Sequence, residues 1–292
     1  MKTAIVGASG YAGTELLRLL LEHPHFEPTV ITAHSNAGEL ISSVAPQLAQ
    51  LGDRRFESFD LAKVNACELV FLALPHGESA ELIAQLDPNL KIVDLGADFR
   101  LSSAEKWIQY YGGTHAGTWT YGLPELPGKR AVIAKSNRVS NPGCYATSIS
   151  LAIAPALGLV ETRDIVVVAA SGTTGAGRSA KINLIASEVT GSLSSYKFGG
   201  VHQHTPEVEE ALTHIACSEV KISFTPILAP MPRGILSTVT AKLTSVATTE
   251  TMHALYTKAY AQDEFVTVLP LGQMPKTNSV IGSNHVHLQV AV

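Results

Sequence analysis

A cysteine beside a Pro-Gly turn is the residue of this sequence best suited to covalent chemistry. The segment Asn141-Pro142-Gly143-Cys144 is typical of a chain reversal, and the apolar, helix-compatible run 146–154 follows it. We therefore predict that Cys144 lies in the first turn of a helix, where the positive end of the helix dipole favours a thiolate. Free N–H groups there could hold the oxyanion of a carbonyl that the sulfur attacks. The alternative is a small buried residue capping a core helix, because free cysteine packs as a hydrophobic side chain.

Two histidines follow one another at a spacing of two residues. His202 and His204 precede a helix that we predict to begin near Pro206. A His-x-His pair is compatible with a metal, but no third ligand of His, Cys or Asp type shares a motif with it. The pattern therefore favours general acid–base chemistry, and we predict no metal. Whichever histidine is not catalytic has a surface loop position as its alternative.

A glycine-rich segment near the N-terminus predicts dinucleotide binding. An apolar strand over residues 2–6 leads into Gly7-Ala8-Ser9-Gly10-Tyr11-Ala12-Gly13, and a helix is predicted over 14–21. Glycine lets the backbone approach a pyrophosphate, which then sits on the helix N-terminus. The spacing Gly-x-x-Gly-x-x-Gly departs from the commoner Gly-x-Gly-x-x-Gly, and the alternative is a plain glycine turn. The predicted cofactor contacts are Gly7, Ser9, Gly10, Tyr11, Ala12 and Gly13.

The end of the next predicted strand, 29–33, bears on which dinucleotide is bound. An acidic residue there would bind the ribose 2′-hydroxyl and select NAD, but the chain has His34, Ser35 and Asn36 instead. All three side chains can hydrogen-bond a 2′-phosphate, so we predict NADP, with Ser35 among its contacts. No arginine lies nearby in the sequence.

Strands and helices alternate along the rest of the first half. Strands are predicted over 69–74 and 91–95 with a helix between them, which indicates a doubly wound sheet with ligands at the strands' carboxyl ends. His76 and Arg100 both fall at such ends. His76 is the more typical of a polar loop residue. Arg100 is a candidate for binding a small anion, with an ion pair to Asp98 as its alternative.

The second half has a different pattern. A strand over 164–170 runs into a second glycine-rich loop, in which Gly175 is a predicted cofactor contact and Arg178 supplies charge. Further strands over 236–243, 265–268 and 285–288 predict an α+β domain with a mainly antiparallel sheet. We also predict a strand at 131–134 that leads to Asn141. The predicted domains are residues 1–143, an NADP-binding Rossmann domain, and residues 144–292, a catalytic and substrate domain.

The composition is that of a globular protein with a large core. Of 292 residues, 46% are hydrophobic and 16% are charged, and the net charge is -4. This balance predicts neither a nucleic-acid nor a membrane partner. The longest apolar runs are too short to cross a bilayer, and Met1 leads directly into a strand without a leader pattern. The three cysteines are widely spaced and form no disulfide framework, so we expect a cytoplasmic protein.

Seven segments resemble, in order, motifs of the N-acetyl-γ-glutamyl-phosphate reductase family of arginine biosynthesis, within the aspartate-semialdehyde dehydrogenase-like superfamily. The resemblance runs from residue 2 to about residue 284. The segments are residues 7–13, 94–100, 121–125, 141–145, 171–178, 202–207 and 232–235.

This resemblance implies NADPH-dependent reduction of the acyl phosphate N-acetyl-L-glutamyl 5-phosphate to a semialdehyde, through a cysteine thioester. It implies Cys144 as the nucleophile, His204 as the acid–base group and His202 near the substrate, in a homo-oligomer, dimer or tetramer. We leave unranked the candidates for binding the leaving phosphate or the substrate carboxylate, which are Arg100, Arg178 and Arg233.

One departure from the family concerns the C-terminus. Similar proteins continue with a strand, an Asp-Asn-Leu-x-Lys-Gly segment and a long helix that packs back toward the cofactor domain, whereas this sequence ends at Val292. We expect that segment to matter for cofactor affinity and domain closure. Two alternatives stay open: a related semialdehyde dehydrogenase acting on aspartyl or aminoadipyl phosphate, and a non-catalytic NADP-binding sensor.

Overall fold

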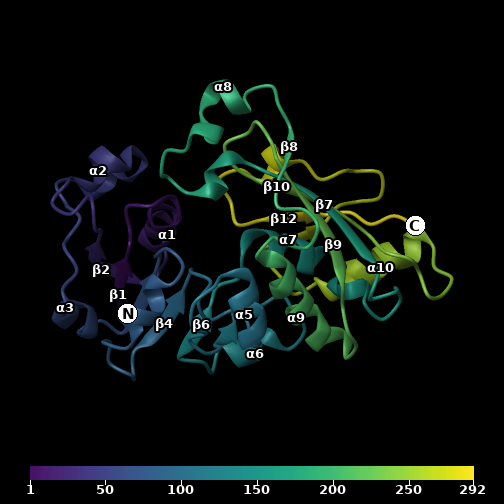
Figure 1. Cartoon of the computed structure of the whole chain (residues 1–292), viewed down its shortest axis with the longest axis horizontal. Coiled ribbons are helices and arrows are strands. Elements are labelled where there is room, and N and C mark those ends of the chain that lie inside the picture. Colours follow the sequence, from purple (N-terminus) through teal and green to yellow (C-terminus); the bar gives the residue numbers. More distant parts are fainter. The chain divides into compact units, whose positions relative to one another are not determined.

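The computed structural model describes residues 1–292, which form two compact units (Figure 1). The first unit comprises residues 1–108, 113–122 and 131–142. The second comprises residues 109–112, 123–130 and 143–292. Two short helices straddle these divisions in the sequence, α5 (Ala104–Tyr110) and α6 (Lys129–Ile133).

The first unit contains a six-stranded parallel sheet in the order β2-β1-β3-β4-β6-β5. The strands are β1 (Lys2–Val6), β2 (Glu27–Thr32), β3 (Leu69–Leu72), β4 (Lys91–Asp94), β5 (Thr120–Tyr121) and β6 (Arg138–Ser140). Its helices are α1 (Tyr11–Leu21), α2 (Ile41–Val44), α3 (Leu61–Asn65) and α4 (Glu78–Ile83).

The sheet of the first unit is buried on both faces, as parallel sheets require. Along β1, Ile5 packs into a core with Leu17 and Ile31, while its neighbours Ala4 and Val6 pack into a separate core on the other face. Successive strand residues point to opposite faces, so the two cores lie on opposite sides of the sheet. This arrangement confirms the predicted doubly wound α/β fold.

One predicted strand was wrong. Residues 131–134 do not form a strand: α6 ends at Ile133, and the side chain of Val132 is 50% exposed. The strand that pairs with β4 and leads to Asn141 is β6, which begins at Arg138. A run of four apolar residues is too short for its periodicity to distinguish a helix from a strand. Here the segment that follows it in the sequence pairs with the sheet instead.

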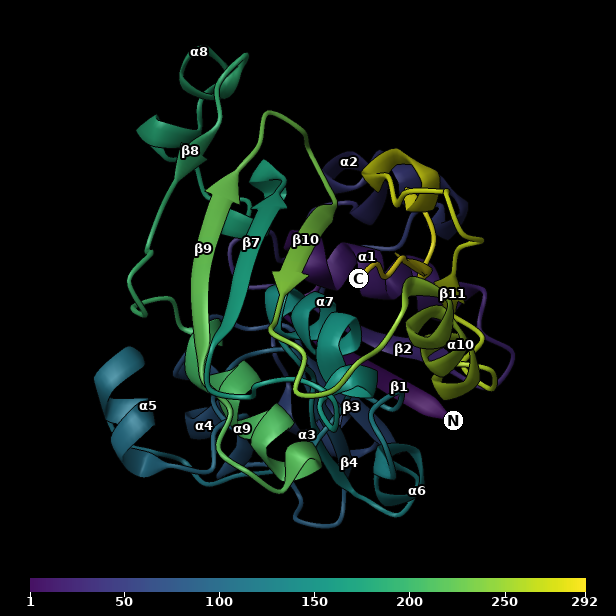
Figure 2. The ribbon, with the colours of Figure 1, turned by 90° about the vertical axis from the view of Figure 1, so that its right-hand side faces the viewer.

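The second unit contains a four-stranded sheet in the order β10-β7-β9-β8, in which Figure 2 shows β9, β7 and β10 side by side. The strands are β7 (Ile165–Ser171), β8 (Ser194–Ser195), β9 (Ile222–Leu228) and β10 (Ile235–Thr240), with a separate pair β11 (Val266–Val268) and β12 (Val286–Leu288). The helices are α7 (Cys144–Ile153), α8 (Ala186–Val189), α9 (His204–Ala216) and α10 (Thr249–Ala259). Across the two units, 3-10 turns cover Pro46–Leu51, Ala154–Ala156, Thr173–Ala176, Ile182–Leu184 and Thr277–Val280.

This second unit is the predicted α+β part of the fold, and its sheet is mixed. β7 pairs antiparallel with β10, and β8 pairs antiparallel with β9, but β7 and β9 run parallel, as do β11 and β12. Alternating polarity identifies a strand but not the direction of its partner. The long connection from β7 to β9, which ends in α9, permits the parallel pairing.

The two faces of this sheet differ in burial. On β7 the side chains of Ile165, Val167 and Ala169 are buried, whereas Val166 and Val168 are 44% and 41% exposed. α7 packs against β10 and α9. α10 secures the end of α7, because the Tyr260 hydroxyl donates to the Leu151 carbonyl at 2.6 Å. None of the helices in either unit is both long enough and apolar enough to cross a membrane.

Candidate active site

Cys144 is the first residue of α7, as predicted, and its side chain is exposed. Gly143 is the N-cap, with extended backbone (φ -67°, ψ 153°). Because glycine has no side chain, it cannot accept a hydrogen bond from the N–H groups of the first turn. The first intrahelical bond runs from the Thr147 N–H to the Gly143 carbonyl at 2.8 Å. The first turn of α7 therefore offers N–H groups that no carbonyl of the helix accepts.

The imidazole of His204 lies directly against Gly143. A Cβ atom at Gly143 would overlap Nε2, Cε1 and Cδ2 of that ring, so only glycine fits beside it. His204 is the first residue of α9, which begins two residues before the predicted start at Pro206. The two helix N-termini thus bring the imidazole next to the residue that precedes Cys144.

A buried carboxylate joins the same two helices. Glu207 is 2% exposed, and its Oε1 accepts the Gly143 N–H at 2.7 Å. It lies on α9 one turn after His204, so a single helix supplies both the ring beside Gly143 and the acceptor of the Gly143 N–H. This hydrogen bond fixes α9 to the N-cap of α7.

His202 is held as a neutral imidazole. It is 7% exposed, and its Nδ1 accepts the N–H of His204 at 3.0 Å. Burial, together with the neighbouring His204, lowers the pKa of His202 from 6.5 to about 3. Because Nδ1 is an acceptor, the single proton of the neutral ring is on Nε2, which is a donor.

Tyr145 connects Cys144 to the sheet. Its hydroxyl donates to the Ser171 Oγ at the end of β7 at 2.7 Å, and it shares a 2.9 Å hydrogen bond with the Tyr196 hydroxyl. Burial is the main cause that raises the pKa of Tyr145, so the phenol stays protonated. Its ring packs edge-on against His202 at a centroid distance of 5.4 Å.

The two arginine-bearing loops of the second unit are bound to each other. The N–H of Gly172 donates to the Gly234 carbonyl at 3.0 Å, and the Thr174 hydroxyl donates to the Pro232 carbonyl at 2.6 Å. A Cβ at Gly172 would overlap the backbone of Pro232 and Arg233, so the close approach requires glycine. Arg178 and Arg233 are exposed residues of these loops, as is Gly175, the predicted cofactor contact.

In the first unit, the glycine turn after β1 has the shape that a pyrophosphate needs. Gly7 has φ +84°, and a Cβ there would overlap the Ala73 carbonyl after β3. A Cβ at Gly13 would overlap the Gly7 carbonyl. α1 begins at Tyr11 after the N-cap Gly10. Because glycine has no side chain, this helix end has no side-chain cap. The closely packed turn and the helix end without a side-chain cap fit a dinucleotide.

The remaining predicted residues lie in loops of the first unit. Ser35 is exposed just after β2, and its hydroxyl donates to the Asn36 side chain at 3.4 Å. Arg100 donates to the carbonyls of Asn141 at 2.8 Å and Leu95 at 2.9 Å. The buried Asp98, its predicted alternative partner, accepts the N–H groups of Gly77 at 2.8 Å and Ala80 at 3.1 Å.

Two family models cover the chain. Residues 2–135 match the semialdehyde dehydrogenase NAD binding domain, and residues 144–292 match the semialdehyde dehydrogenase dimerisation domain. A protein of Acidothermus cellulolyticus named N-acetyl-gamma-glutamyl-phosphate reductase is 55% identical over 99% of this chain and 85% of its own length. One of the same name from Streptomyces coelicolor is 52% identical over 100% of this chain and 85% of its own length. The chain belongs to the N-acetyl-gamma-glutamyl-phosphate reductases of the semialdehyde dehydrogenase family.

A solved structure supports the fold of this family member. The crystal structure of aspartate semialdehyde dehydrogenase II complexed with ASA from Vibrio cholerae has a TM-score of 0.70 and covers 98% of this chain and 86% of that chain. The sequence identity is 14%, so this likeness speaks to the fold.

Sequence reasoning missed two residues of the site in this reductase-family chain. Glu207 falls within the segment 202–207, and its signal is an acidic residue in the first turn of a predicted helix. Tyr145 follows the candidate nucleophile directly, yet nothing in the sequence indicates that its hydroxyl reaches Ser171, 26 residues away.

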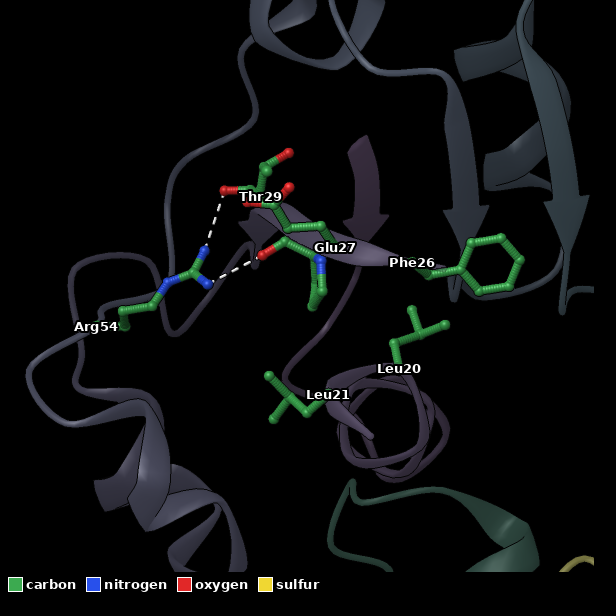
Figure 3. Close-up of a pocket in the computed structure, with 7 residues that line it drawn as sticks. Leu20, Leu21, Phe26, Glu27, Thr29 and Arg54 are labelled. Atoms are coloured by element: carbon green, nitrogen blue, oxygen red, sulfur yellow. Dashed lines mark hydrogen bonds between the residues drawn. The ribbon is translucent and has the colours of Figure 1, made fainter. Parts of the chain in front are cut away.

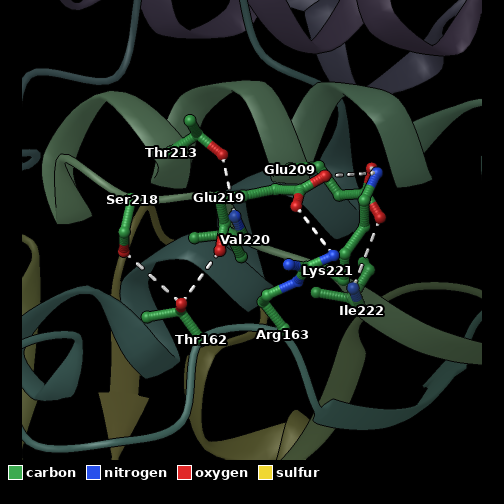
Figure 4. A network of polar contacts seen from close by, with 9 residues as sticks. All are labelled: Thr162, Arg163, Glu209, Thr213, Ser218, Glu219, Val220, Lys221 and Ile222. Carbon is green, nitrogen blue, oxygen red and sulfur yellow. Dashed lines mark hydrogen bonds and ion pairs between the residues drawn. The ribbon is translucent and has the colours of Figure 1, made fainter.

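In this family member a polar network holds the middle and C-terminal part of α9 against the segment before β9 (Figure 4). Glu209 accepts from Lys221 Nζ at 3.1 Å and from the Ile222 N–H at 3.4 Å, and the Val220 N–H donates to Thr213 at 3.0 Å. These contacts tie α9 to the segment that enters β9. The helix that carries His204 and Glu207 is therefore anchored along its length.

A surface pocket in the first unit lies apart from the predicted residues (Figure 3). It is lined by Leu20, Leu21, Phe26, Glu27, Pro28, Thr29 and Arg54. The guanidinium of Arg54 donates to the carbonyls of Pro28 at 2.9 Å and Thr29 at 3.0 Å. Figure 3 shows it directed toward the labelled Thr29. Both hydrogen bonds go to the backbone of β2, so this arginine supports the strand.

Proposed function

We propose that this chain reduces N-acetyl-L-glutamyl 5-phosphate to N-acetyl-L-glutamate 5-semialdehyde and phosphate, with NADPH as the reductant, in L-arginine biosynthesis. The observation that carries the proposal is the position of Cys144, exposed at the start of α7 with the His204 ring against the preceding glycine. The names of relatives at 50–55% identity supply the substrate.

Cys144 is the proposed nucleophile. Its sulfur attacks the acyl carbon, a C–S bond forms, and the C–O bond to phosphate breaks, which leaves a thioester and free phosphate. N–H groups in the first turn of α7 are placed to stabilise the oxyanion that develops on the acyl oxygen. NADPH, when bound, supplies the hydride that reduces the thioester carbonyl. The C–S bond then breaks, its electron pair returns to Cys144, and the aldehyde leaves.

The two histidines have different proposed roles. His204, half-buried against Gly143, is the proposed acid–base group, which takes the thiol proton and returns it to the sulfur as the C–S bond of the tetrahedral adduct breaks. His202 stays neutral over the working pH range, so its Nε2–H is a fixed donor for a substrate oxygen. One histidine therefore moves protons while the other holds the substrate.

Arginines are the proposed partners of the substrate's anionic groups. Arg178 and Arg233 are exposed on two loops that hydrogen bonds hold together, which suits a shared site for phosphate or carboxylate. Arg100 belongs to the same proposal from the first unit, where it also braces the segment before Cys144 through the Asn141 carbonyl.

The NADP site of the proposal begins at the glycine turn of the first unit. Support comes from the closely packed turn and the helix end without a side-chain cap at Gly10. The proposed contacts are Gly7, Ser9, Gly10, Tyr11, Ala12, Gly13 and Ser35, with Gly175 from the second unit. We assign residues 1–143 to the cofactor domain and 144–292 to the catalytic domain.

A homo-oligomer is proposed for the second unit. The family model matched by residues 144–292 is a dimerisation domain, and one sheet face leaves Val166, Val168 and Leu236 exposed. We expect Val168→Lys to yield monomers in light scattering, because a charge would be buried on that face. A cytoplasmic location is proposed on the three free cysteines, which suit a reducing compartment.

The test runs the reaction backwards. Phosphate-dependent reduction of NADP⁺ is measured with N-acetyl-L-glutamate 5-semialdehyde, and with aspartate 4-semialdehyde as the competing substrate, in wild type and Cys144→Ala. We expect a preference for the acetylated substrate and a loss of at least about 1,000-fold in Cys144→Ala, with NADPH binding retained. Turnover that survives in Cys144→Ala would overturn the thioester route, and NADPH binding without any wild-type turnover would indicate a sensor.

A further inference from the structure

The loop that follows β2 in the first unit lies at the carboxyl end of this strand, where the adenine ribose of a dinucleotide binds in such sheets. The loop of residues 34–40 has no acidic side chain before Glu39 and no lysine or arginine. Its sequence predicts NADP without supplying the positive charge that usually accompanies a 2′-phosphate.

The fold brings a second segment, residues 54–57, alongside this loop. Leu40 pairs with Arg55 in an antiparallel bridge, and the Gly38 N–H donates to the Phe56 carbonyl at 2.8 Å. The Ala33 N–H donates to the Glu57 carbonyl at 3.0 Å. The segment therefore frames the loop from its start to its end.

Arg55 on this segment places its guanidinium at the loop. Nη1 donates to the Gly38 carbonyl at 2.8 Å, two residues beyond Asn36, while the side chain as a whole is exposed. A guanidinium has five N–H donors in a rigid fork, so one anchoring bond leaves donors for a phosphate. The charge that is missing from the loop's own sequence is supplied from 17 residues away.

The acid that the same segment brings to the end of β2 does not compete with this role. Glu57 accepts from Lys63 Nζ at 2.5 Å, so its charge is paired with a lysine. A carboxylate committed in this way is a poor partner for a ribose 2′-hydroxyl. The groups left for a ligand at this end of β2 are the Arg55 guanidinium and the polar side chains of residues 34–36.

We propose that Arg55 recognises the 2′-phosphate of NADPH, with Ser35 and Asn36 beside it, and so sets the preference for NADPH over NADH. This proposal rests on the proposed NADP-dependent function. Arg54, one residue earlier, provides the contrast: its guanidinium is committed to the carbonyls of Pro28 and Thr29, on the backbone of β2 itself (Figure 3).

The test measures binding without turnover. Titration calorimetry gives the Kd of NADPH, NADH, adenosine 2′,5′-bisphosphate and AMP for wild type, Arg55→Gln, Arg55→Lys and Arg54→Gln. We expect Arg55→Gln to weaken NADPH and the bisphosphate by about 10-fold or more, with NADH unchanged. Arg55→Lys should recover part of the loss, because it keeps the charge and loses the fork. Arg54→Gln should keep the NADPH-to-NADH ratio.

Three results would count against the assignment, and they are distinguishable. An unchanged NADPH-to-NADH ratio in Arg55→Gln, with wild type preferring NADPH, would remove Arg55 alone and leave the proposed NADP dependence standing. Equal binding of NADPH and NADH by wild type would remove the NADP preference of the proposed function and the role of Arg55 with it. A loss of the ratio in Arg54→Gln equal to that in Arg55→Gln would also count against Arg55 as the specific contact.

Discussion

Two helices of this chain begin in the same way and are proposed to serve different chemistry. α1 and α7 each follow the end of a parallel strand, and each has a glycine N-cap without a side-chain hydrogen bond. The caps share an extended backbone, with φ -73° and ψ 170° at Gly10 and φ -67° and ψ 153° at Gly143. What differs is the surroundings of each helix end.

At α1 the close neighbours of the glycine turn are backbone atoms of the turn itself and of the segment after β3, and Tyr11 and Ala12 are exposed. At α7 the helix end meets α9, whose His204 ring and Glu207 carboxylate both press on Gly143. A phosphate group that binds and leaves needs an open helix end. A nucleophile needs partners that are already in position.

The largest effect should come from filling the space at the crowded helix end. In Gly143→Ala the new methyl group overlaps the His204 ring, so we expect kcat to fall by at least about 100-fold. The Kd of NADPH should stay within about twofold, because the α1 turn is untouched. Gly158→Ala is the matched control, since that glycine has open space around it. A near-normal kcat in Gly143→Ala would contradict the crowded geometry.

A second effect should appear in stability, because the crowded end buries an imidazole. The pKa of His202 is about 3 in the folded chain and 6.5 ordinarily, so the folded form binds fewer protons between these values. The resulting stability is present above pH 6.5 and is lost as the pH falls toward 3. At pH 5 wild type should have lost about 2 kcal/mol through this group.

His202→Gln keeps an acceptor for the His204 N–H and removes the titration. Its free energy of unfolding, from urea titrations at pH 7 and pH 5, should therefore fall less with pH than that of wild type. His214 is an exposed histidine in the last turn of α9, and His214→Gln should behave as wild type. Parallel pH profiles for wild type and His202→Gln would show that the burial of His202 has no such cost.

A methyl group in the closely packed glycine turn before α1 should affect cofactor binding more than turnover. In Gly13→Ala the methyl group overlaps the Gly7 carbonyl and the backbone of Ala8, so the turn must shift away from its pyrophosphate geometry. We expect the Kd of NADPH to rise about 10-fold, with kcat at saturating NADPH within about threefold of wild type. The measurement is NADPH fluorescence titration alongside steady-state kinetics. A loss confined to kcat would show that the two helix ends are not separable.

The smallest effect concerns the carboxylate that holds Gly143. Glu207→Gln keeps an oxygen acceptor for the Gly143 N–H but removes the charge, which weakens the bond by about 1 kcal/mol. We expect kcat to fall about fivefold with the KM for NADPH unchanged. Glu210→Gln, three residues further along α9, is the control and should be near wild type. Equal effects in both variants would assign the change to α9 in general.

The sequence by itself determined the features that rest on local patterns. Fully apolar strands separated by helices specify a parallel sheet buried on both faces, and β1, β3 and β4 form within a few residues of the predicted ranges. A Pro-Gly turn before an apolar run specifies a helix start, and α7 begins at Cys144. The run at 131–134 carried too little periodicity, and it became part of α6.

Only the tertiary structure decided which distant groups meet. Glu207 reaches the Gly143 N–H across 64 residues, and the Arg55 guanidinium reaches Gly38 across 17. Such pairs depend on which helix ends and loops the packing of the cores brings together, and no short-range pattern encodes that choice. A buried donor such as the Gly143 N–H requires an acceptor, but the fold alone settles that the acceptor comes from α9.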